Sequence, residues 1–430
     1  MKKTISFPVD NFSELRIQML NWANRFNIFC FLDNREYDFS APAFECLLAA
    51  GCKRSVEASA GKAFEALQHF YAAEKNEWLF GHFAYDLKNE TEQLSSGNFD
   101  GIGFPDLFFF VPEVLLQLDK EKLTITCDED ATDIFNNILL CPKHISVVNE
   151  MQVEVQNRIS KHDYTGIIEK LRQHILRGDC YEINFCQEFF ATDAVVDPLV
   201  VYSRLTELSP NPFSVLYRLA DRYCSCASPE RYLKKKANRV FSQPIKGTSK
   251  RDHRHPHLDE ANKQYLVQSS KEKSENVMVV DLVRNDLSRI CIPGSVQVDE
   301  LFGLYSFPQV HQMISTVSGE LAADADPVEV IRASFPMGSM TGAPKLRVME
   351  LIETYEQTRR GLFSGAIGYF KPGEEQSDFD FNVVIRSIFY NAGKKYLSFQ
   401  TGSGITFYSD AEKEYEECLL KAAAIKSILQ

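Results

Sequence analysis

Apolar residues in this chain come in short runs separated by turn residues, and this spacing limits the folds open to the chain more than any other feature. Runs such as Ile28–Leu32 and Phe104–Val111 have the length of single β-strands. No apolar run approaches the length of about 18 residues that a membrane-spanning helix requires. The spacing therefore predicts mixed strands and helices, and no membrane span.

The N-terminus and the cysteines both indicate an intracellular protein. Pro8, Asp10 and Glu14 interrupt the continuous apolar segment that an export signal needs. The eleven cysteines are scattered, and the closest pair, Cys224 and Cys226, lacks the spacing of a usual zinc site. Reduced thiols in the cytoplasm are the expected state.

Length and charge narrow the classes of function. The 430 residues, of which 44% are hydrophobic and 25% charged, are enough for a large core or for about two or three lobes. The 59 acidic residues outnumber the 47 basic ones, which gives a formal net charge of -12. Because no basic block is present to follow a phosphate backbone, we expect no nucleic-acid partner.

Groups suited to chemistry lie mainly in the second part of the chain. Residues 1–150 contain strand-length apolar runs and few such groups, which indicates an N-terminal supporting region. The composition changes after Cys141–Pro142, and polar clusters bounded by glycine are frequent from His162 onward. We therefore place a soft boundary near residue 150 and assign the chemistry to residues 151–430.

Several helices and strands are predicted in this second region. Apolar residues between Ile167 and Leu176 follow helical spacing and stop before Gly178, a common helix end. Two further helices are expected: one over 264–289, which no glycine or proline interrupts, and one over 411–429. At the start of the latter, Ser409 and Glu412 have the spacing of a capping box. The segments that resemble strands are 180–190, 365–370, 381–389 and 396–400.

Two pairs of glutamates at i,i+3 spacing lie on the last two of these helices. Glu272 and Glu275 form one pair, Glu414 and Glu417 the other, and each pair places two carboxylates on one helix face. A cation relieves their repulsion, and Mg2+ is suited because it takes one or two protein carboxylates together with water and substrate oxygens. Lys421 shares the face of the second pair. A solvated helix face is the alternative for each pair taken alone.

Proline and glycine fix the backbone around a single lysine, Lys246, in the segment Pro244–Thr248. A lysine near other cations or in an apolar pocket has a lowered pKa and becomes a nucleophile. Glu230, in the segment Ser228–Glu230, is a candidate to stay protonated and to donate to a leaving hydroxyl. An ordinary solvated loop lysine is the alternative.

Three further positions have both a functional and a structural interpretation. The segment Thr401–Ile405, with Gly402 and Gly404, follows a predicted strand, so it is either a place where backbone N–H groups approach an anion or a plain tight turn. Arg386, at the end of a predicted strand, is suited to a bidentate clamp on a carboxylate. His311 is either a pocket residue or a core histidine whose hydrogen bonds are satisfied.

Taken in their order, these segments resemble one family, the chorismate-utilising enzymes, which includes anthranilate, aminodeoxychorismate, isochorismate and salicylate synthases. The resemblance is strong from about residue 160 to residue 425, and before residue 150 only Gly81–Leu87 resembles a family segment. It rests on ASPERY (227–232), PIKGT (244–248), KEKSENVMVVDLVRNDLSR (271–289), FPMGSMTGAPKLRVMELIE (335–353), RRGLFSGAIGYF (359–370), DFNVVIRS (380–387) and GSGI (402–405).

The resemblance implies an α+β fold in which two antiparallel β-sheets pack face to face, with helices outside and the active site between the layers. It implies Mg2+ as cofactor, with Glu275 and Glu417 as ligands and with Glu272 and Glu414 holding metal-bound water. Glu230 then corresponds to the general acid for loss of the C4 hydroxyl of chorismate. The groups that would bind or line the substrate are Thr248, His311, Ser339, Arg386, Gly402, Gly404 and Lys421.

Position 246 indicates which reaction of the family to expect. Anthranilate synthases resemble PIAGT at 244–248, whereas many aminodeoxychorismate synthases have the lysine of PIKGT. The resemblance implies that Lys246 attacks C2 of chorismate as the C4 hydroxyl departs, and that ammonia then adds at C4. Isochorismate and salicylate synthases have a water-activating lysine where this chain has Glu182, so attack of water at C2 is disfavoured. We therefore expect an aminodeoxychorismate synthase, which commits chorismate to p-aminobenzoate and folate.

The remaining expectations concern partners and alternatives. The sequence contains no glutaminase residues, so ammonia is expected to be free or to come from a separate glutaminase subunit. Phe363 replaces a frequent tyrosine, and one hydroxyl contact to substrate is expected to be missing. Leu32–Asn34 stands where tryptophan-regulated relatives have Leu-Leu-Glu-Ser, which argues against feedback by tryptophan. Anthranilate synthase component I and a catalytically silent chorismate-binding regulator are the alternatives.

Overall fold

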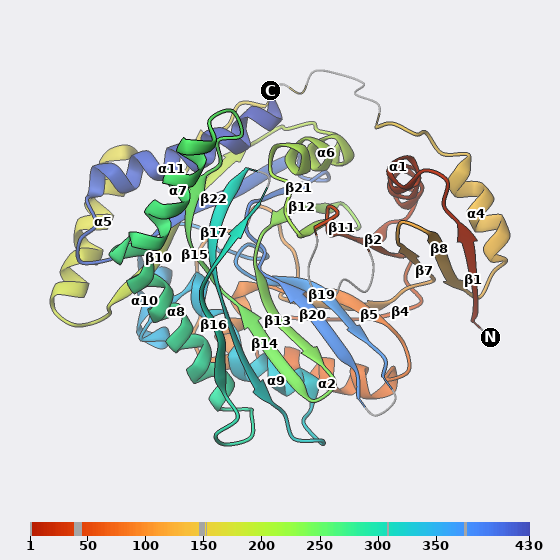
Figure 1. The fold of residues 1–430 in the computed structure, drawn as a ribbon, viewed down its shortest axis with the longest axis horizontal. Coiled ribbons are helices and arrows are strands. Elements are labelled where there is room, and N and C mark those ends of the chain that lie inside the picture. Colours follow the sequence, from red (N-terminus) through yellow and green to blue (C-terminus); the bar gives the residue numbers. More distant parts are fainter. Residues whose placement is uncertain (1, 38–44, 146–150, 152, 308, 374–375) are drawn as a thin grey trace.

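Two large antiparallel β-sheets dominate the fold. The computed structural model describes residues 2–37, 45–145, 151, 153–307, 309–373 and 376–430. One sheet has twelve strands and the other has ten, and neighbouring strands are antiparallel throughout both. Figure 1 shows the strands at the centre of the molecule, with helices around them.

The twelve-stranded sheet is the larger sheet, and the ten-stranded sheet is the smaller one. The larger sheet has the order β1 (Lys3–Pro8), β8 (Lys122–Cys127), β7 (Val114–Leu118), β3 (Cys46–Ala50), β2 (Ile28–Asp33), β11 (Phe213–Leu219), β12 (Arg222–Ser228), β21 (Ser387–Asn391), β22 (Tyr396–Ile405), β10 (Glu182–Ala191) and β18 (Gly342–Ala343), with β9 (Gln156–Asn157) beside β10. The smaller sheet has the order β15 (Ile245–Lys250), β17 (Val310–Glu320), β14 (Arg239–Gln243), β13 (Arg231–Lys236), β20 (Asp378–Asn382), β19 (Ala366–Lys371), β5 (Leu79–Phe83), β6 (Leu107–Val111) and β4 (Arg54–Ala58), with β16 (Gln297–Ser306) beside β17.

Strands from both sides of residue 150 pair with each other in both sheets. In the larger sheet β2 pairs with β11, and in the smaller sheet β5 pairs with β19. Residues 1–150 and 151–430 are therefore joined by backbone hydrogen bonds into one two-sheet structure. The division of roles between the two regions stays a prediction.

The strand β5 shows how the two faces of the smaller sheet are used. Successive side chains of a strand point to opposite faces. His82 shares a 3.1 Å hydrogen bond with the Tyr217 hydroxyl of the larger sheet. Phe83, the next residue, stacks on Phe64 of α2 (Ala63–Ala73), with 6.0 Å between ring centroids. One face of the smaller sheet thus meets the larger sheet, and the other meets helices.

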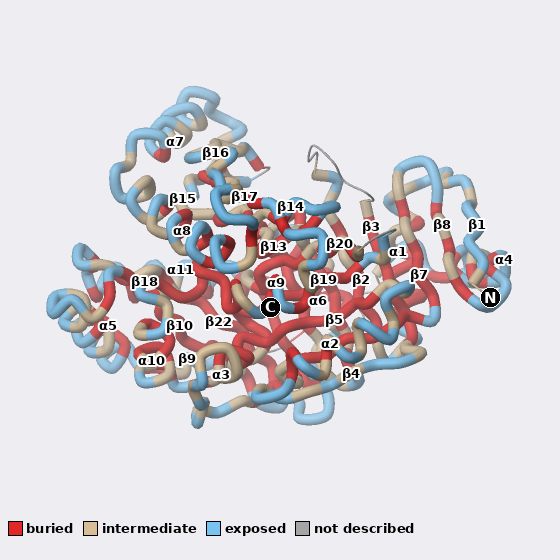
Figure 2. Tube along the Cα trace, turned by 90° about the horizontal axis from the view of Figure 1, so that it is seen from below, coloured by how far each residue is buried: buried red, intermediate tan, exposed pale blue. Residues whose placement is uncertain are grey.

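Helices cover the outer faces of both sheets, and Figure 2 shows the buried residues running along the strands between them. On the larger sheet lie α1 (Phe12–Ala23), α4 (Ala131–Leu139), α5 (Lys161–Leu176), α6 (Pro198–Leu208), α10 (Lys345–Tyr355) and α11 (Ala411–Lys426). Against the smaller sheet pack α2, α7 (Pro256–Gln268), α8 (Ser270–Ser288) and α9 (Pro327–Ser334). The predicted α+β fold of two packed antiparallel sheets is confirmed.

Part of the predicted secondary structure is confirmed. The helix predicted to stop before Gly178 is α5, which ends at Leu176, and Gly178 has a φ of +84°. The strands predicted over 180–190, 365–370 and 396–400 correspond to β10, β19 and β22. The spacing of apolar residues and the position of glycine were sufficient to locate these elements, because each element is regular from end to end.

The single helix predicted over 264–289 is wrong. The structure has two helices there, α7 and α8, and Ser269 separates them with an extended backbone (φ −66°, ψ 110°). The Ser269 hydroxyl accepts a hydrogen bond from the Glu272 N–H and so caps the second helix. A serine that caps a helix end is indistinguishable, in the sequence alone, from one that lies within a helix.

Two other boundaries also differ from the prediction. The strand predicted over 381–389 is wrong because the chain changes sheet within it, from β20 in the smaller sheet to β21 in the larger. The last helix ends at Lys426 and is capped by Asp410, which accepts from the Lys413 N–H, so the predicted capping box of Ser409 is wrong. Ser409 instead accepts from the Thr406 N–H.

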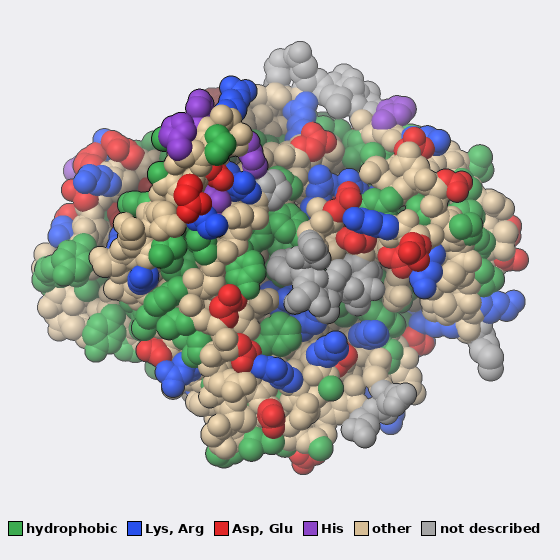
Figure 3. All heavy atoms as spheres, viewed as in Figure 1, with side chains coloured by type: hydrophobic (Ala, Val, Ile, Leu, Met, Phe, Trp, Pro, Cys, Tyr) green, Lys and Arg blue, Asp and Glu red, His purple; other side chains and the backbone are tan. Residues whose placement is uncertain are grey.

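The surface agrees with the charge pattern of the sequence. Figure 3 shows acidic and basic side chains interspersed on one face, with histidines gathered near α7 and no continuous basic tract on that face. All eleven cysteines are free thiols. Over the ranges described above, none of the helices combines the length and the apolar character needed to cross a bilayer.

Candidate active site

Two connections that pass between the sheets form the centre of the candidate site. The chain leaves β12 in the larger sheet and enters β13 in the smaller sheet through Glu230, and it returns from β20 to β21 through a segment that ends at Arg386. Backbone hydrogen bonds hold these connections side by side: Ala227 N–H donates to the Arg386 carbonyl (3.1 Å), and Val383 N–H donates to the Glu230 carbonyl (3.0 Å). Two predicted site residues therefore meet where the sheets join.

The side chain of Arg386 is partly buried and reaches no acceptor in the described part of the chain. Its backbone has a φ of 50°, which is uncommon for a residue other than glycine and accompanies the change of sheet. Its guanidinium forms no hydrogen bond or ion pair with the residues that the structure describes. Burial lowers its pKa, although Tyr37 and Glu230 act in the opposite direction. A partly buried guanidinium whose donors are not engaged is suited to bind a carboxylate.

Glu230 is buried in the same junction, with only 5% of its surface exposed. Burial raises the pKa of its carboxyl group to about 7, while the nearby Ser339 hydroxyl, Lys246 and Arg386 limit the rise. Ser339 itself is buried and lies on the short helical turn Gly338–Met340. A carboxyl group with this pKa holds its proton for part of the time at neutral pH, so it can protonate a leaving hydroxyl.

Lys246 lies on β15, and its side chain reaches across to the other sheet. Its Nζ donates to Oε1 of Glu182 on β10 at 2.8 Å, and the two side chains are only 13% and 4% exposed. Burial acts to lower the pKa of Lys246, but Glu182, Glu275 and Glu230 outweigh it, and the pKa is raised. The lowered pKa expected from the sequence is therefore wrong, because carboxylates rather than cations surround this lysine.

The glycines of 401–405 lie in a strand, not in a turn. The plain tight turn offered as the alternative for this segment is wrong, because β22 continues to Ile405 and pairs with β10. The approach of backbone N–H groups to an anion stays a prediction. A Cβ at Gly402 would lie 2.0 Å from the Phe185 carbonyl oxygen. A Cβ at Gly404 would lie 2.6 Å from Oε1 of Glu182. Glycine at 402 thus permits close strand pairing, and glycine at 404 leaves room for the Glu182 carboxylate.

The glutamates of α8 lie next to Lys246. Burial raises the pKa of Glu275 to about 7, and Glu182 and Glu272 add to the rise. Burial also raises the pKa of Glu272, with Lys271 and Lys246 opposing it. Gly247, beside Lys246, has a φ of +93°, and a Cβ there would lie 3.1 Å from Oε2 of Glu272. The backbone of the PIKGT segment is therefore shaped to approach α8.

The two predicted site glutamates of α11, Glu414 and Glu417, differ in exposure and in their bonding partners. Glu414 is buried and accepts a short hydrogen bond (2.5 Å) from the Ser403 hydroxyl. Glu417 is about half exposed and pairs with Lys421 at 2.8 Å. Burial acts to raise the pKa of Glu417, but Lys421 outweighs it and the pKa is lowered. Lys421 also donates to the Gly402 carbonyl oxygen at 2.9 Å, which ties α11 to β22.

A further lysine, Lys271, lies within electrostatic reach of all four glutamates. Burial acts to lower its pKa, but Glu275, Glu414, Glu272 and Glu417 outweigh it and the pKa is raised. Counted over the described ranges, no group of three or more His, Cys, Asp or Glu side chains is close enough to form a metal centre. The oxygen-only donors fit an ion such as Mg2+, which needs only one or two protein carboxylates.

Two residues predicted to line the substrate pocket, His311 and Thr248, have surroundings that differ from those of Glu230 and Lys246. His311 is buried, and both of its ring nitrogens are engaged, one with Ser306 at 2.8 Å and one with Asp259 of α7 at 3.0 Å. It therefore has the environment of the satisfied core histidine that was kept as an alternative. Thr248, on β15, is exposed.

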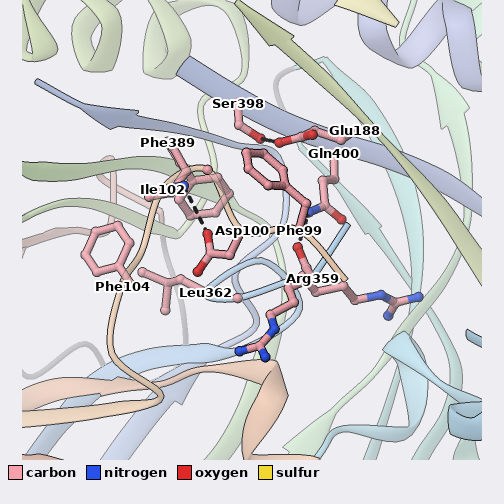
Figure 4. A pocket seen from close by; sticks show the side chains of 13 residues that line it. Phe99, Asp100, Ile102, Phe104, Glu188, Arg359, Leu362, Phe389, Ser398 and Gln400 are labelled. Carbon is pink, nitrogen blue, oxygen red and sulfur yellow. Dashed lines mark hydrogen bonds between the residues drawn. The ribbon is translucent and has the colours of Figure 1, made fainter. Parts of the chain in front are cut away.

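A separate pocket lies between strands β10, β21 and β22 of the larger sheet and the segments 99–104 and 359–362, and its polar side chains already have hydrogen-bond partners. Figure 4 shows its lining, which includes Phe99, Phe389, Glu188 and Gln400. The Ser398 hydroxyl donates to Glu188 at 2.7 Å. Gln400 donates to a backbone carbonyl at 3.2 Å. With its polar side chains engaged in this way, the pocket is less suited to chemistry than the junction that holds Lys246.

Sequence reasoning missed two residues of the site. Glu182 was noted only because it stands where isochorismate and salicylate synthases have a water-activating lysine. The structure makes it the direct partner of Lys246. Lys271 was not considered, although its position four residues before Glu275 on one helix predicts their proximity, and the two side chains lie 3.9 Å apart. The pairing of Glu182 had no signal in the sequence, because it joins strands of different sheets.

The sequence of this chain is similar to those of known proteins. The family described as "chorismate binding enzyme" matches residues 28–427. The chain is 32% identical over 365 residues to aminodeoxychorismate synthase component 1 of Bacillus subtilis (strain 168), which covers 81% of this chain and 76% of that protein. It is 33% identical over 360 residues to an anthranilate synthase component I-like protein of Synechocystis sp., covering 82% and 72%.

A solved structure gives the same result. The crystal structure of anthranilate synthase component I from Streptococcus pneumoniae TIGR4 matches with a TM-score of 0.77 and 26% identity, covering 92% of this chain and 94% of that one. The family resemblance predicted from the motifs is confirmed, and the chain belongs to the family of chorismate binding enzymes.

Proposed function

We propose that this chain is the synthase subunit that converts chorismate and ammonia to 4-amino-4-deoxychorismate, on the way to p-aminobenzoate and folate. The observation that carries the proposal is the position of Lys246, whose amino group lies among buried carboxylates near Glu230. Displacement of a hydroxyl by an amine needs a nucleophile and an acid that is protonated near neutral pH. Relatives named aminodeoxychorismate synthase component 1 support the same reaction.

In the proposed mechanism, two side chains act on opposite ends of the reacting system. Lys246, once it has lost a proton, forms a bond from Nζ to C2 while the C4–O bond breaks. Glu230 gives its proton to the departing hydroxyl, which leaves as water. Ammonia then adds at C4, and the C2–N bond breaks with its electron pair returning to Nζ. Arg386 is suited to hold a carboxylate of the substrate during both steps.

Mg2+ is part of the proposal as a cofactor. Glu275 and Glu417 would bind it directly, and Glu272 and Glu414 would hold its water molecules. When bound, the ion supplies positive charge that neutralises and orients a carboxylate of the substrate. The contribution of the protein is to present carboxylates from two helices, α8 and α11, to the same space.

A separate glutaminase subunit is proposed as the source of ammonia in the cell. The designation "component 1" of the relatives supports a second component. With the purified chain alone, we expect turnover with ammonium and almost none with glutamine. Turnover with glutamine alone would contradict this part of the proposal.

The test is the identity of the product. The purified chain is incubated with chorismate, Mg2+ and ammonium, with and without an added aminodeoxychorismate lyase, and the aromatic product is identified by chromatography and mass spectrometry. We expect p-aminobenzoate only when the lyase is present. Anthranilate in the absence of lyase would instead establish the second candidate, an anthranilate synthase, which the match to that enzyme's structure favours. Binding of chorismate without any product would indicate a silent regulator.

A further inference from the structure

Glu182 is the direct partner of Lys246, and only half of its carboxylate is used. Oε1 accepts the hydrogen bond from Lys246 at 2.8 Å, while Oε2 is buried and has no hydrogen-bond partner in the described part of the chain. A buried carboxylate oxygen without a donor lowers the stability of a folded protein. Packing alone therefore does not account for a glutamate at this position.

The neighbouring strand leaves space for this carboxylate. Glu182 is the first residue of β10, and Gly404 lies on β22, which pairs with β10. A Cβ at Gly404 would lie 2.6 Å from Oε1 of Glu182 and 3.4 Å from Nζ of Lys246. The missing side chain therefore keeps open the space in which the two groups meet.

We propose that Glu182 positions Lys246 for attack on the substrate and accepts the proton that Lys246 must lose. The inference rests on the proposed function, in which Lys246 is the nucleophile. The proton on Nζ moves to Oε1 of Glu182, and the free electron pair of Nζ then forms the bond to C2. When the C2–N bond breaks after ammonia has added, Glu182 returns the proton to Nζ. The proton that ammonia loses at C4 restores the acid form of Glu230, so the net change is chorismate plus ammonia to the amine plus water.

Other charged groups face this pair and affect its pH dependence. Glu230 lies on the connection between the sheets, Glu275 and Glu272 lie on α8, and Glu417 lies on α11. Lys271 adds a second positive charge beside these glutamates. A test of Glu182 must therefore compare variants under identical Mg2+ and free-ammonia concentrations.

The experiment uses the full-length chain with Glu182→Gln, which retains the size of the side chain and removes its proton acceptor. Rates are measured with chorismate across pH at constant free ammonia. We expect kcat at neutral pH to fall by about a hundredfold, the scale of a lost general base, while KM for chorismate changes by less than about threefold. The deficit should shrink as the pH rises, because Lys246 then loses its proton to solvent.

Glu188→Gln is the matched control. Glu188 lies on the same strand, its side chain is 4% exposed, and it pairs with Arg158 at 2.7 Å. This variant should keep the wild-type kcat and pH profile. A Glu182→Gln enzyme as active as the wild type, or a deficit that is the same at every pH, would overturn the proposal.

A second readout does not depend on the product. Labelling of Lys246 by an amine-reactive reagent, followed by peptide mass spectrometry, should begin at a lower pH in Glu182→Gln than in the wild type. Equal labelling at every pH would contradict the proposed contact. The identity of the wild-type product tests the proposed function, and the ratio of variant to wild-type rate, on whichever amine is formed, tests Glu182, so the two failures are distinguishable.

Discussion

Two glutamates of β10, Glu182 and Glu188, are equally buried but are bonded in different ways. Oxygens of Glu188 accept from Arg158 (2.9 and 2.7 Å), from the Tyr396 hydroxyl (3.0 Å) and from the Ser398 hydroxyl (2.7 Å). Glu182 has a single partner, Lys246, and one oxygen without any among the described residues. The comparison indicates that the number of satisfied oxygens, rather than burial or charge, separates a structural carboxylate from one available for chemistry.

The largest effects are expected when Glu182 and Glu188 lose their basic partners, Lys246 and Arg158. Lys246→Ala removes the proposed nucleophile, so formation of the 4-amino product should fall by about two orders of magnitude or more, with a smaller change in chorismate binding. A substrate adduct on the peptide that contains Lys246 should be detectable by mass spectrometry of quenched wild-type enzyme, and it should be absent from the variant.

Arg158→Ala is the counterpart on the structural side. It should lower the midpoint of thermal unfolding and leave turnover near the wild-type value. Arg158 donates to Glu188 and to the Tyr396 hydroxyl and lies over the Phe190 ring, and none of these three belongs to the candidate site. A Lys246→Ala enzyme that makes the product at the wild-type rate would remove the difference between the two glutamates.

The next largest effect concerns the glutamates of α11. Glu417→Gln should abolish most activity, because it removes a proposed Mg2+ ligand, and excess EDTA should do the same to the wild type. Glu416→Gln provides the control, since Glu416 is exposed on the same helix and does not belong to either pair. Full turnover in excess EDTA would rule out the dependence on metal.

The pH dependence of turnover tests the role of Glu230 as an acid. Burial raises the pKa of its carboxyl group to about 7, so the protonated form that the mechanism needs is present below that pH and is lost above it. At constant free ammonia and saturating Mg2+, kcat/KM should fall by about tenfold for each pH unit above 7. This descending limb should disappear in Glu230→Gln and should persist in Glu188→Gln. A flat profile in the wild type would exclude the acid role.

A smaller effect is expected from Gly404→Ala. The added Cβ would lie 2.6 Å from Oε1 of Glu182, and the flexible carboxylate should move away from Lys246. Since the pair is disturbed and not removed, turnover should fall by roughly tenfold, less than in Glu182→Gln. Gly393→Ala, on the surface turn after β21, would place its Cβ 2.5 Å from an oxygen of Asp221 and serves as the control. Equal activity of both variants would show that the space at 404 is not needed.

Regular elements of this fold were predictable from sequence, whereas changes of partner were not. Hydrophobic spacing and Gly178 located α5 because both signals are local. The break at Ser269 and the change of sheet before Arg386 depend on contacts with distant segments, and neither has a local signal. The strand pairing of Gly402 and Gly404 was missed for the same reason.

In the candidate site, too, local features were predictable from the sequence and contacts between distant segments were not. The family motifs identified Glu230, Lys246 and the glutamate pairs as residues to examine, but a motif contains no information about the protonation of a side chain. The expected pKa of Lys246 had the wrong direction because its three carboxylate neighbours come from three separate parts of the chain. The hydrogen bonds of His311 to Ser306 and Asp259 likewise require knowledge of the folded strands and of α7.

The paired connections between the sheets have a consequence for the evolution of reaction specificity. Glu230 and Arg386 are fixed relative to each other by backbone hydrogen bonds, so mutational drift of surrounding side chains leaves their spacing unchanged. Lys246 and Glu182 enter the same space from strands of different sheets. Substitutions at 182 and 246 are therefore expected to redirect the attacking group while departure of the hydroxyl is retained, which makes these two positions the natural starting point for converting one activity of this architecture into another.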